Sequence, residues 1–255
     1  MSPGNLGALF FIACSNQIAC PVPSYVHVSL PTGGIRQMIR FLLLSFALFG
    51  LNQELRAEAD WTLKRDREGI KVYTRSIEGS AHKAVRAEMI VQASINALVG
   101  LTMDTSACPK WAALCKRAEI VRRESETEFY VYTFNDLPWP VKDRDVVAKV
   151  TWSADPVGSV GMTAKLVTGL VPEKNKVVRL SDGITRWAFS PTQNGETRVV
   201  SYVHLDPGGS IPAWLTNTLL IDSPYETLQG MRILVQTGQY DDARFAFIGV
   251  AATDQ

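Results

Sequence analysis

The residues best suited to chemistry are histidines and cysteines, because their side chains bind metals and serve as bases or nucleophiles. The chain after residue 59 holds two of each: His82, His204, Cys108 and Cys115. A zinc site takes three or four ligands, and the spacing of these four residues matches no zinc pattern. We therefore predict no metal site and interpret both histidines as surface or half-buried residues.

Motifs of covalent catalysis and of phosphate binding are missing from the sequence. There is no G-x-S-x-G elbow, and Gly158-Ser159-Val160-Gly161 lacks the Lys-Ser/Thr pair that completes a phosphate loop. Gly208 and Gly209 precede an expected helix, whose start can attract an anion, but such glycines more often only make the turn. We predict no catalytic residue and no cofactor, so the protein is not expected to be an enzyme.

Two arginines are candidates for structural or ligand-binding roles. Arg144 lies between Asp143 and Asp145 at a proline-rich turn, and we interpret it as part of an ion pair that fixes this turn. Arg179 lies in a short strand whose alternation does not decide which way it points. If Arg179 points inward, it is the best candidate to meet the polar end of a ligand, because a buried charge without a partner is costly.

The first sixty residues indicate export. Met38-Ile39-Arg40, the apolar run 41–51 and Ala57-Glu58-Ala59 form the pattern of a signal peptide over 38–59, cleaved near Ala59. Residues 1–37 are interpreted as a mis-extended N-terminus. A lipoprotein site at Cys20 is the less favoured alternative, because Gln17 stands where such sites carry an aliphatic residue. The mature protein is predicted to be periplasmic or secreted.

An exported protein meets an oxidising compartment, where a disulfide between Cys108 and Cys115 is permitted. On a continuous helix, residues seven apart lie about 10 Å apart, which is too far for a bridge. Pro109 can break the segment and bring the two thiols together. A disulfide and two buried free thiols both stay open. The formal net charge of +1 offers no basic excess, so we expect no nucleic-acid partner.

The elements that must position these residues are mostly strands. Strand patterns cover residues 61–65, 70–76, 83–92, 118–124, 129–135, 145–152, 160–167, 177–180, 185–189 and 197–205. Helices are expected over 95–105 and 107–115, and a long apolar helix over about 212–240, which is kinked or restarts at the capping box Ser223-Pro224-Tyr225-Glu226.

This order predicts an α+β domain over residues 60–240, followed by a tail over 241–255. The domain is a curved antiparallel sheet of about nine strands, closed by the long C-terminal helix. A curled sheet with a helix across its mouth encloses a space. Composition alone does not separate a packed core from a lined cavity.

Four motifs, in this order and in this context of strands and helices, are shared with one known family. They are Trp61 with Gly69-Ile70-Lys71-Val72-Tyr73-Thr74-Arg75; Pro138-Trp139-Pro140-Val141 with Asp143-Arg144-Asp145; Trp187-x-Phe189-x-Pro191; and Asp206-Pro207-Gly208-Gly209-x-Ile211-Pro212-x-Trp214-Leu215-x-Asn217. The chain resembles the START family of StAR-related lipid transfer domains, in particular its exported bacterial members, over essentially 60–240. The resemblance implies a helix-grip fold, as in the Bet v1-like superfamily, with a tunnel that holds one hydrophobic molecule, often a lipid or sterol.

The residues that we predict to line this tunnel come from the strands and from the last helix. They are Val146, Val150, Trp152, Met162, Leu166, Arg179, Leu228, Met231 and Val235. Apart from Arg179 they are apolar, and the alternative is that they form an ordinary core.

We predict a monomer that binds, and carries, a hydrophobic small molecule such as a lipid or sterol, in transient contact with a membrane. Two alternatives stay open. A cyclase- or aromatase-like enzyme on the same scaffold would direct several titratable groups into the cavity. A ligand-sensing interaction module would expose apolar area around Trp139 or Trp214.

Overall fold

The structure of the chain is a computed structural model that describes residues 60–249. The predicted signal peptide over 38–59, the extension over 1–37 and the end of the tail over 250–255 lie outside the described residues. Within residues 60–249, no helix combines the length and the apolar character needed to cross a membrane.

Ten strands form one sheet in this part of the chain. They are β1 (Thr62–Arg67), β2 (Ile70–Ser76), β3 (Lys83–Val91), β4 (Cys115–Arg123), β5 (Glu128–Asn135), β6 (Arg144–Ala154), β7 (Val160–Leu166), β8 (Val178–Arg179), β9 (Gly183–Pro191) and β10 (Thr197–Leu205). The predicted strand ranges match these elements closely, because apolar and polar residues alternate along most of them.

The sheet follows the order β1-β2-β3-β10-β9-β7-β6-β5-β4, with every neighbouring pair antiparallel. The short β8 lies off this path and pairs in parallel with the start of β6. The predicted antiparallel sheet of about nine strands is confirmed, with β8 as one parallel addition.

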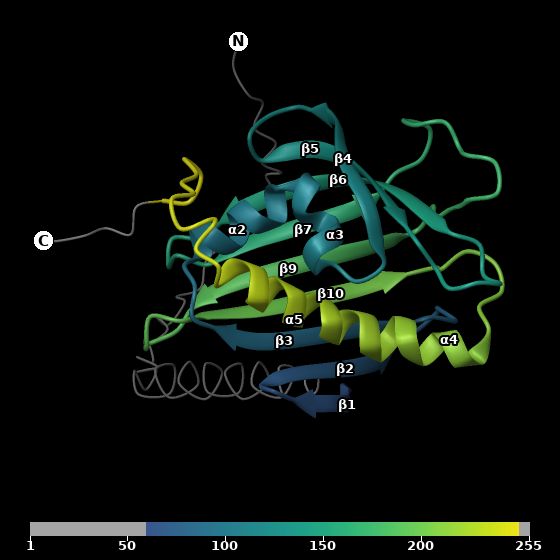
Figure 1. Cartoon of the computed structure of the whole chain (residues 1–255), viewed down its shortest axis with the longest axis horizontal. Coiled ribbons are helices and arrows are strands. Elements are labelled where there is room, and N and C mark those ends of the chain that lie inside the picture. The colour runs from purple at the N-terminus through teal and green to yellow at the C-terminus, as the bar shows by residue number, and fades with distance from the viewer. Residues whose placement is uncertain (1–59, 250–255) are drawn as a thin grey trace, which may run out of the picture. The chain divides into compact units, whose positions relative to one another are not determined.

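The helices pack on one face of this sheet, which we call the inner face (Figure 1). They are α2 (Ile95–Met103), a 3₁₀ turn (Thr105–Ala107), α3 (Cys108–Trp111), α4 (Ala213–Asn217), a π-helical turn η2 (Thr218–Asp222) and α5 (Ser223–Val235). Figure 1 shows α5 running across the strands from α4 toward α2. The α+β helix-grip architecture is therefore confirmed.

The C-terminal helix does not restart at residue 223. The helix passes from α4 through η2 into α5 without a break, and Ser223 has helical φ and ψ angles of −61° and −42°. The Ser223 hydroxyl caps nothing and has no hydrogen-bond partner. The predicted capping box is wrong, because a cap requires a non-helical residue ahead of the helix and here a π turn precedes Ser223.

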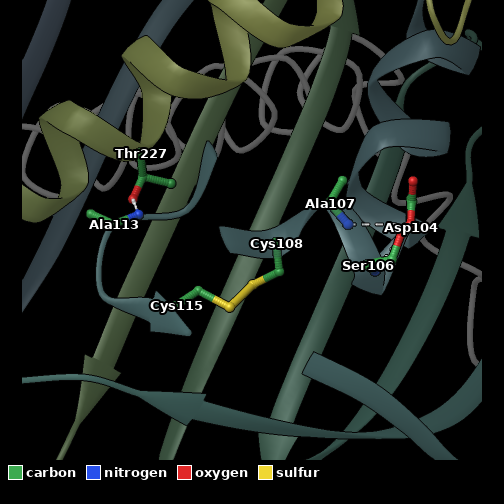
Figure 2. The surroundings of a disulfide bond; sticks show 7 residues. All are labelled: Asp104, Ser106, Ala107, Cys108, Ala113, Cys115 and Thr227. Atoms are coloured by element: carbon green, nitrogen blue, oxygen red, sulfur yellow. Dashed lines mark hydrogen bonds between the residues drawn. A yellow bond between two sulfur atoms is a disulfide. The ribbon is translucent and has the colours of Figure 1, made fainter. Parts of the chain in front are cut away.

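The segment over 107–115 is also less helical than predicted. Helix α3 ends at Trp111, and the chain turns at Leu114, whose φ is +67°. A disulfide joins Cys108 at the start of α3 to Cys115 at the start of β4, with the two Cα atoms 6.0 Å apart (Figure 2). The helix break brings the two thiols together and lets β4 begin at residue 115 rather than 118.

Helix α5 is held on its two sides by different segments. On one side, the Ala113 N–H donates to Thr227 Oγ1 at 3.1 Å (Figure 2). On the other side, Tyr225 and Gln229 donate to the carboxylate of Glu68 in the β1–β2 turn. The hydrogen bond from Tyr225 is the main reason why the pKa of Glu68 is lowered.

Gly230 allows the closest approach on the disulfide side of α5. A Cβ atom at this position would lie 2.6 Å from the carbonyl oxygen and 2.8 Å from the Cα of Trp111. Since both atoms belong to the backbone, they cannot move aside as a side chain would. Gly230 therefore sets how near α5 lies to the loop after α3.

We predict that Gly230→Ala destabilises the protein by about 1 to 3 kcal/mol, because the added methyl group overpacks this contact. At an unconstrained helix position, the same change stabilises by about 1 kcal/mol. The sign of the change therefore tests the contact, with free energies of unfolding measured by urea denaturation. Gly249→Ala, where a Cβ meets nothing within 4 Å, is the control, and a stabilising Gly230→Ala would contradict the packing described.

Candidate functional site

The inner face under α5 is built from the apolar positions of β6 and β7. Because strand side chains alternate, Val146, Val150 and Trp152 point to the same face of β6. Met162 lies opposite Trp152, and Leu166 lies opposite Ala148, on the paired strand β7. Val150, Trp152 and Met162 are buried, whereas Val146 and Leu166 are half-buried.

Helix α5 supplies the other wall of this site. Leu228, Met231 and Val235 are fully buried and belong to the same core cluster as Val150, Trp152 and Met162. They recur at intervals of three and four residues, which places them on one side of the helix. The cluster thus contains six of the nine predicted site residues. Val146 and Leu166 share its face of the sheet but are half-buried and lie outside the cluster, and Arg179 lies elsewhere.

A row of aromatic rings extends the inner face beyond the predicted residues. The ring of Trp111 meets Trp187 edge-on at 6.0 Å, Trp187 stacks with Phe189 at 6.2 Å, and Phe189 stacks with Trp152 at 6.3 Å. Trp187 and Phe189 were not predicted as site residues, although their spacing of two within β9 already places them on one face. The contact of Trp111 with Trp187 packs the end of α3 onto the sheet.

The C-terminal tail covers the Trp152 end of this row. The ring of Phe247 lies 6.1 Å from that of Trp152, and Phe245, Phe247 and Ile248 pack against the core cluster. Tyr240 donates a hydrogen bond to Asp104 at 2.9 Å, and burial together with this bond raises the pKa of Tyr240 to about 12. Residues 241–248 of the predicted tail are therefore part of the folded domain.

Arg144 lies at the far end of β6 and holds the loop that leads into α4. Its Nε and Nη2 donate to the carbonyls of Pro207 and Gly208, each at 3.2 Å, and its Nη1 donates to the carbonyl of Lys142. Burial lowers the pKa of Arg144, and the charge of Asp143 opposes this shift. Arg144 fixes the predicted turn, but through backbone carbonyls rather than through the predicted ion pair.

The two histidines both contact Ser80, although the sequence separates them widely. His82 Nε2 lies 3.3 Å from Asp206 Oδ1, and His204 Nε2 lies 3.1 Å from Ser80 Oγ. Across residues 60–249, no three His, Cys, Asp or Glu side chains gather closely enough to hold a metal ion. The contacts of the two histidines join the β2–β3 connection to the end of β10.

Comparison with known proteins shows what kind of domain carries this face. The family model of the START domain matches residues 50–244. The chain belongs to the START family. The predicted family is thereby confirmed, and the four motifs that carried the resemblance all lie within the matched residues.

Two similar proteins are bacterial. This START domain is 34% identical over 198 residues to an uncharacterized protein of Pseudomonas aeruginosa, covering 78% of this chain and 97% of that protein. It is 32% identical to a fragment of the StAR-related lipid transfer protein of Xanthomonas axonopodis, whose structure superposes with a TM-score of 0.64 over 69% of this chain and 99% of the fragment. Human StAR-related lipid transfer protein 5 shares the fold, with a TM-score of 0.66 over 79% of this chain and 99% of its own, at 19% identity.

In this START domain, Arg179 points away from the inner face. It pairs with Asp145, the neighbour of inward-facing Val146, and so lies on the outer face of the sheet. Arg179 Nε and Nη2 donate to the two oxygens of Asp145 at 2.7 and 3.0 Å, and the two side chains are only 4% and 1% exposed. These hydrogen bonds raise the pKa of Arg179.

Further hydrogen bonds surround this pair and attach the segment over 167–178 to the outer face. Tyr132 donates to Asp145 at 3.0 Å, Lys174 donates to Tyr132 at 3.0 Å, and Arg179 donates to the carbonyls of Val171 and Pro172. The charge of Arg179 is thus compensated within the protein. The arrangement gives Arg179 a structural role at the start of β6.

We predict that Arg179→Met destabilises the protein by about 3 to 5 kcal/mol, because it leaves Asp145 buried without its counter-charge. The measurement is the free energy of unfolding in urea. Lys116→Met, which removes an exposed ion pair with Asp136, should change stability by less than about 1 kcal/mol. If the two substitutions lower the free energy of unfolding equally, the buried ion pair between Arg179 and Asp145 does not contribute to stability as its short distances indicate.

Proposed function

We propose that this START domain binds a hydrophobic small molecule, lipid-like or sterol-like, between the inner face and α5, and that it carries this molecule. The observation that supports the proposal is the buried apolar cluster formed by Val150, Trp152 and Met162 with Leu228 and Met231 in a START domain. Relatives named phosphatidylcholine transfer protein, from rat and mouse at 25% and 26% identity, favour a lipid. Binding would gain about 25 cal/mol per Å² of apolar surface removed from water.

Binding without catalysis is the version that we favour. Within residues 60–249, the buried charged side chains include Arg144, Asp145 and Arg179. Arg144 is engaged by backbone carbonyls, and Asp145 lies on the outer face with Arg179. A cyclase-like enzyme needs titratable groups directed at its substrate, and the inner face offers apolar side chains instead.

We further propose that the protein acts after export, in the periplasm or outside the cell. The signal-peptide pattern over 38–59 supports this location. The disulfide between Cys108 and Cys115 also supports it, because disulfides persist in oxidising compartments.

We predict that Leu166→Trp reduces lipid binding about tenfold, because a large ring at this half-buried inner position fills space that a ligand needs. The protein is expressed from the full chain and purified, and native mass spectrometry then measures how much dioleoyl phosphatidylcholine it takes up from vesicles. A lipid extract of the expression host is tested in parallel, so that the result does not depend on one headgroup.

The matched control is Lys165→Trp, which adds the same ring to the preceding residue of β7, on the outer face. It should bind lipid as the parent protein does. Equal losses in the two variants would contradict a site on the inner face. A parent protein that carries no adduct and takes up nothing from either lipid source would contradict lipid binding altogether.

Contact with a membrane is proposed at the β5–β6 loop, where Trp139 is 90% exposed. The loop is anchored by the hydrogen bond from the Leu137 N–H to Asp143 at 3.0 Å and by the contacts of Arg144. Pro138 and Pro140 flank the ring and restrict its backbone. An exposed tryptophan on an anchored loop suits the interface of a bilayer, where an amphipathic ring is favoured.

We predict that Trp139→Ala weakens binding to phosphatidylcholine vesicles several-fold, on the scale of about 1 kcal/mol for one inserted ring. Its stability should change by less than about 0.5 kcal/mol, because the residue is exposed. Flotation with vesicles measures the binding. Val157→Ala is the control, since Val157 is 79% exposed in the β6–β7 turn, beyond the opposite end of β6. Equal losses in the two variants would remove the special role of the loop.

A further inference from the structure

Trp152 carries a buried hydrogen-bond donor that nothing in the protein satisfies. Its side chain lies on the inner face, and the residue is 4% exposed. Its Nε1 is shielded from solvent and has no acceptor within reach. Buried donors are nearly always paired in folded proteins, because losing the hydrogen bond to water is costly. This N–H therefore requires an explanation that an apolar core does not supply.

Trp111 shows the same property at the other end of the aromatic row. Its Nε1 is buried and without a partner, and its ring meets Trp187 between the sheet and α5. An indole N–H donates and cannot accept. Both unpaired groups are therefore donors, and an acceptor is what would satisfy either of them.

The charged side chains on the inner side of the sheet limit which acceptor can bind beside Trp152. Within residues 60–249, the one buried cation on the inner side of β6 is Arg144, and three of its nitrogens already donate to carbonyls. Arg144 lies eight residues from Trp152, which is about 26 Å along a strand. Arg123, whose guanidinium lies 4.9 Å from the Phe129 ring on the neighbouring strand, is exposed. A carboxylate or phosphate beside Trp152 would therefore be buried without a buried counter-charge, which is strongly unfavourable.

We propose that the molecule held under α5 carries a neutral carbonyl group, as in an ester or a ketone, which accepts a hydrogen bond from Trp152 Nε1. Trp111 Nε1 provides a second donor for an acceptor farther along the molecule. This inference rests on the proposed function and narrows its ligand class. It distinguishes a neutral acceptor-bearing lipid from a free fatty acid and from a plain hydrocarbon.

The test uses two probes of similar size, methyl oleate and 1-octadecene, with oleic acid as a third. Protein purified from expression of the full chain and labelled with ¹⁵N at tryptophan gives one indole signal per ring. We expect methyl oleate, but not 1-octadecene, to shift the Trp152 Nε1 proton downfield, as a new hydrogen bond does. This chemical shift is measured on the unsubstituted protein, so the test does not require any variant to fold.

Trp152→Phe keeps the ring in the row but removes the donor. We expect it to weaken binding of methyl oleate about tenfold while changing that of 1-octadecene less than twofold. Trp187→Phe is the matched control in the same row. Its indole is not among the unpaired buried donors, so it should change the binding of both probes to the same extent.

Three other results would contradict the proposal, and each points to a different error. If methyl oleate and 1-octadecene bind equally well and Trp152→Phe affects them alike, the carbonyl contact is wrong but hydrophobic binding stands. If oleic acid binds more tightly than its ester at neutral pH, the acceptor is charged and the inference fails. If no probe binds, the inference fails, and the uptake of lipid from vesicles and from the host extract decides separately whether the proposed function stands.

Discussion

The packing of α5 against the sheet depends on one close contact, that of Gly230 with the backbone of Trp111. The disulfide between Cys108 and Cys115 holds the segment that makes this contact. Across the helix, Glu68 in the β1–β2 turn accepts hydrogen bonds from Tyr225 and Gln229. Because both sides of α5 are held, the distance between the helix and the inner face is fixed. This distance decides what fits between them.

Most of the sheet could be predicted from the sequence because its strands obey a simple alternation. In β6, Val146, Val150 and Trp152 share a face by spacing alone, and the structure places them as expected. The C-terminal helix was harder, because Ser223 followed by Pro224 has the composition of a helix start. A π turn ahead of Ser223 makes it an interior residue, and no local sequence rule separates the two cases.

The roles of the charged residues at the start of β6 could not be predicted, because their partners come from distant segments. Arg144 is adjacent to Asp143 and Asp145, yet it bonds to carbonyls at 207 and 208. Asp145 instead pairs with Arg179, which β8 brings alongside β6. Which arginine meets which carboxylate was settled by the parallel pairing of β8 with β6. The sequence predicted the strand over 177–180 but not the strand with which it pairs.

The two ends of β6 therefore differ in whether their buried polar groups have hydrogen-bond partners. At its start, Asp145 and Arg179 are buried but satisfied by each other and by Tyr132, so they need nothing from outside. Near its end, the Trp152 N–H is equally buried and satisfied by nothing. A folded protein tolerates the first arrangement as part of its structure. The second is costly in the empty protein and favourable once an acceptor arrives, which is the free-energy difference that a binding site requires.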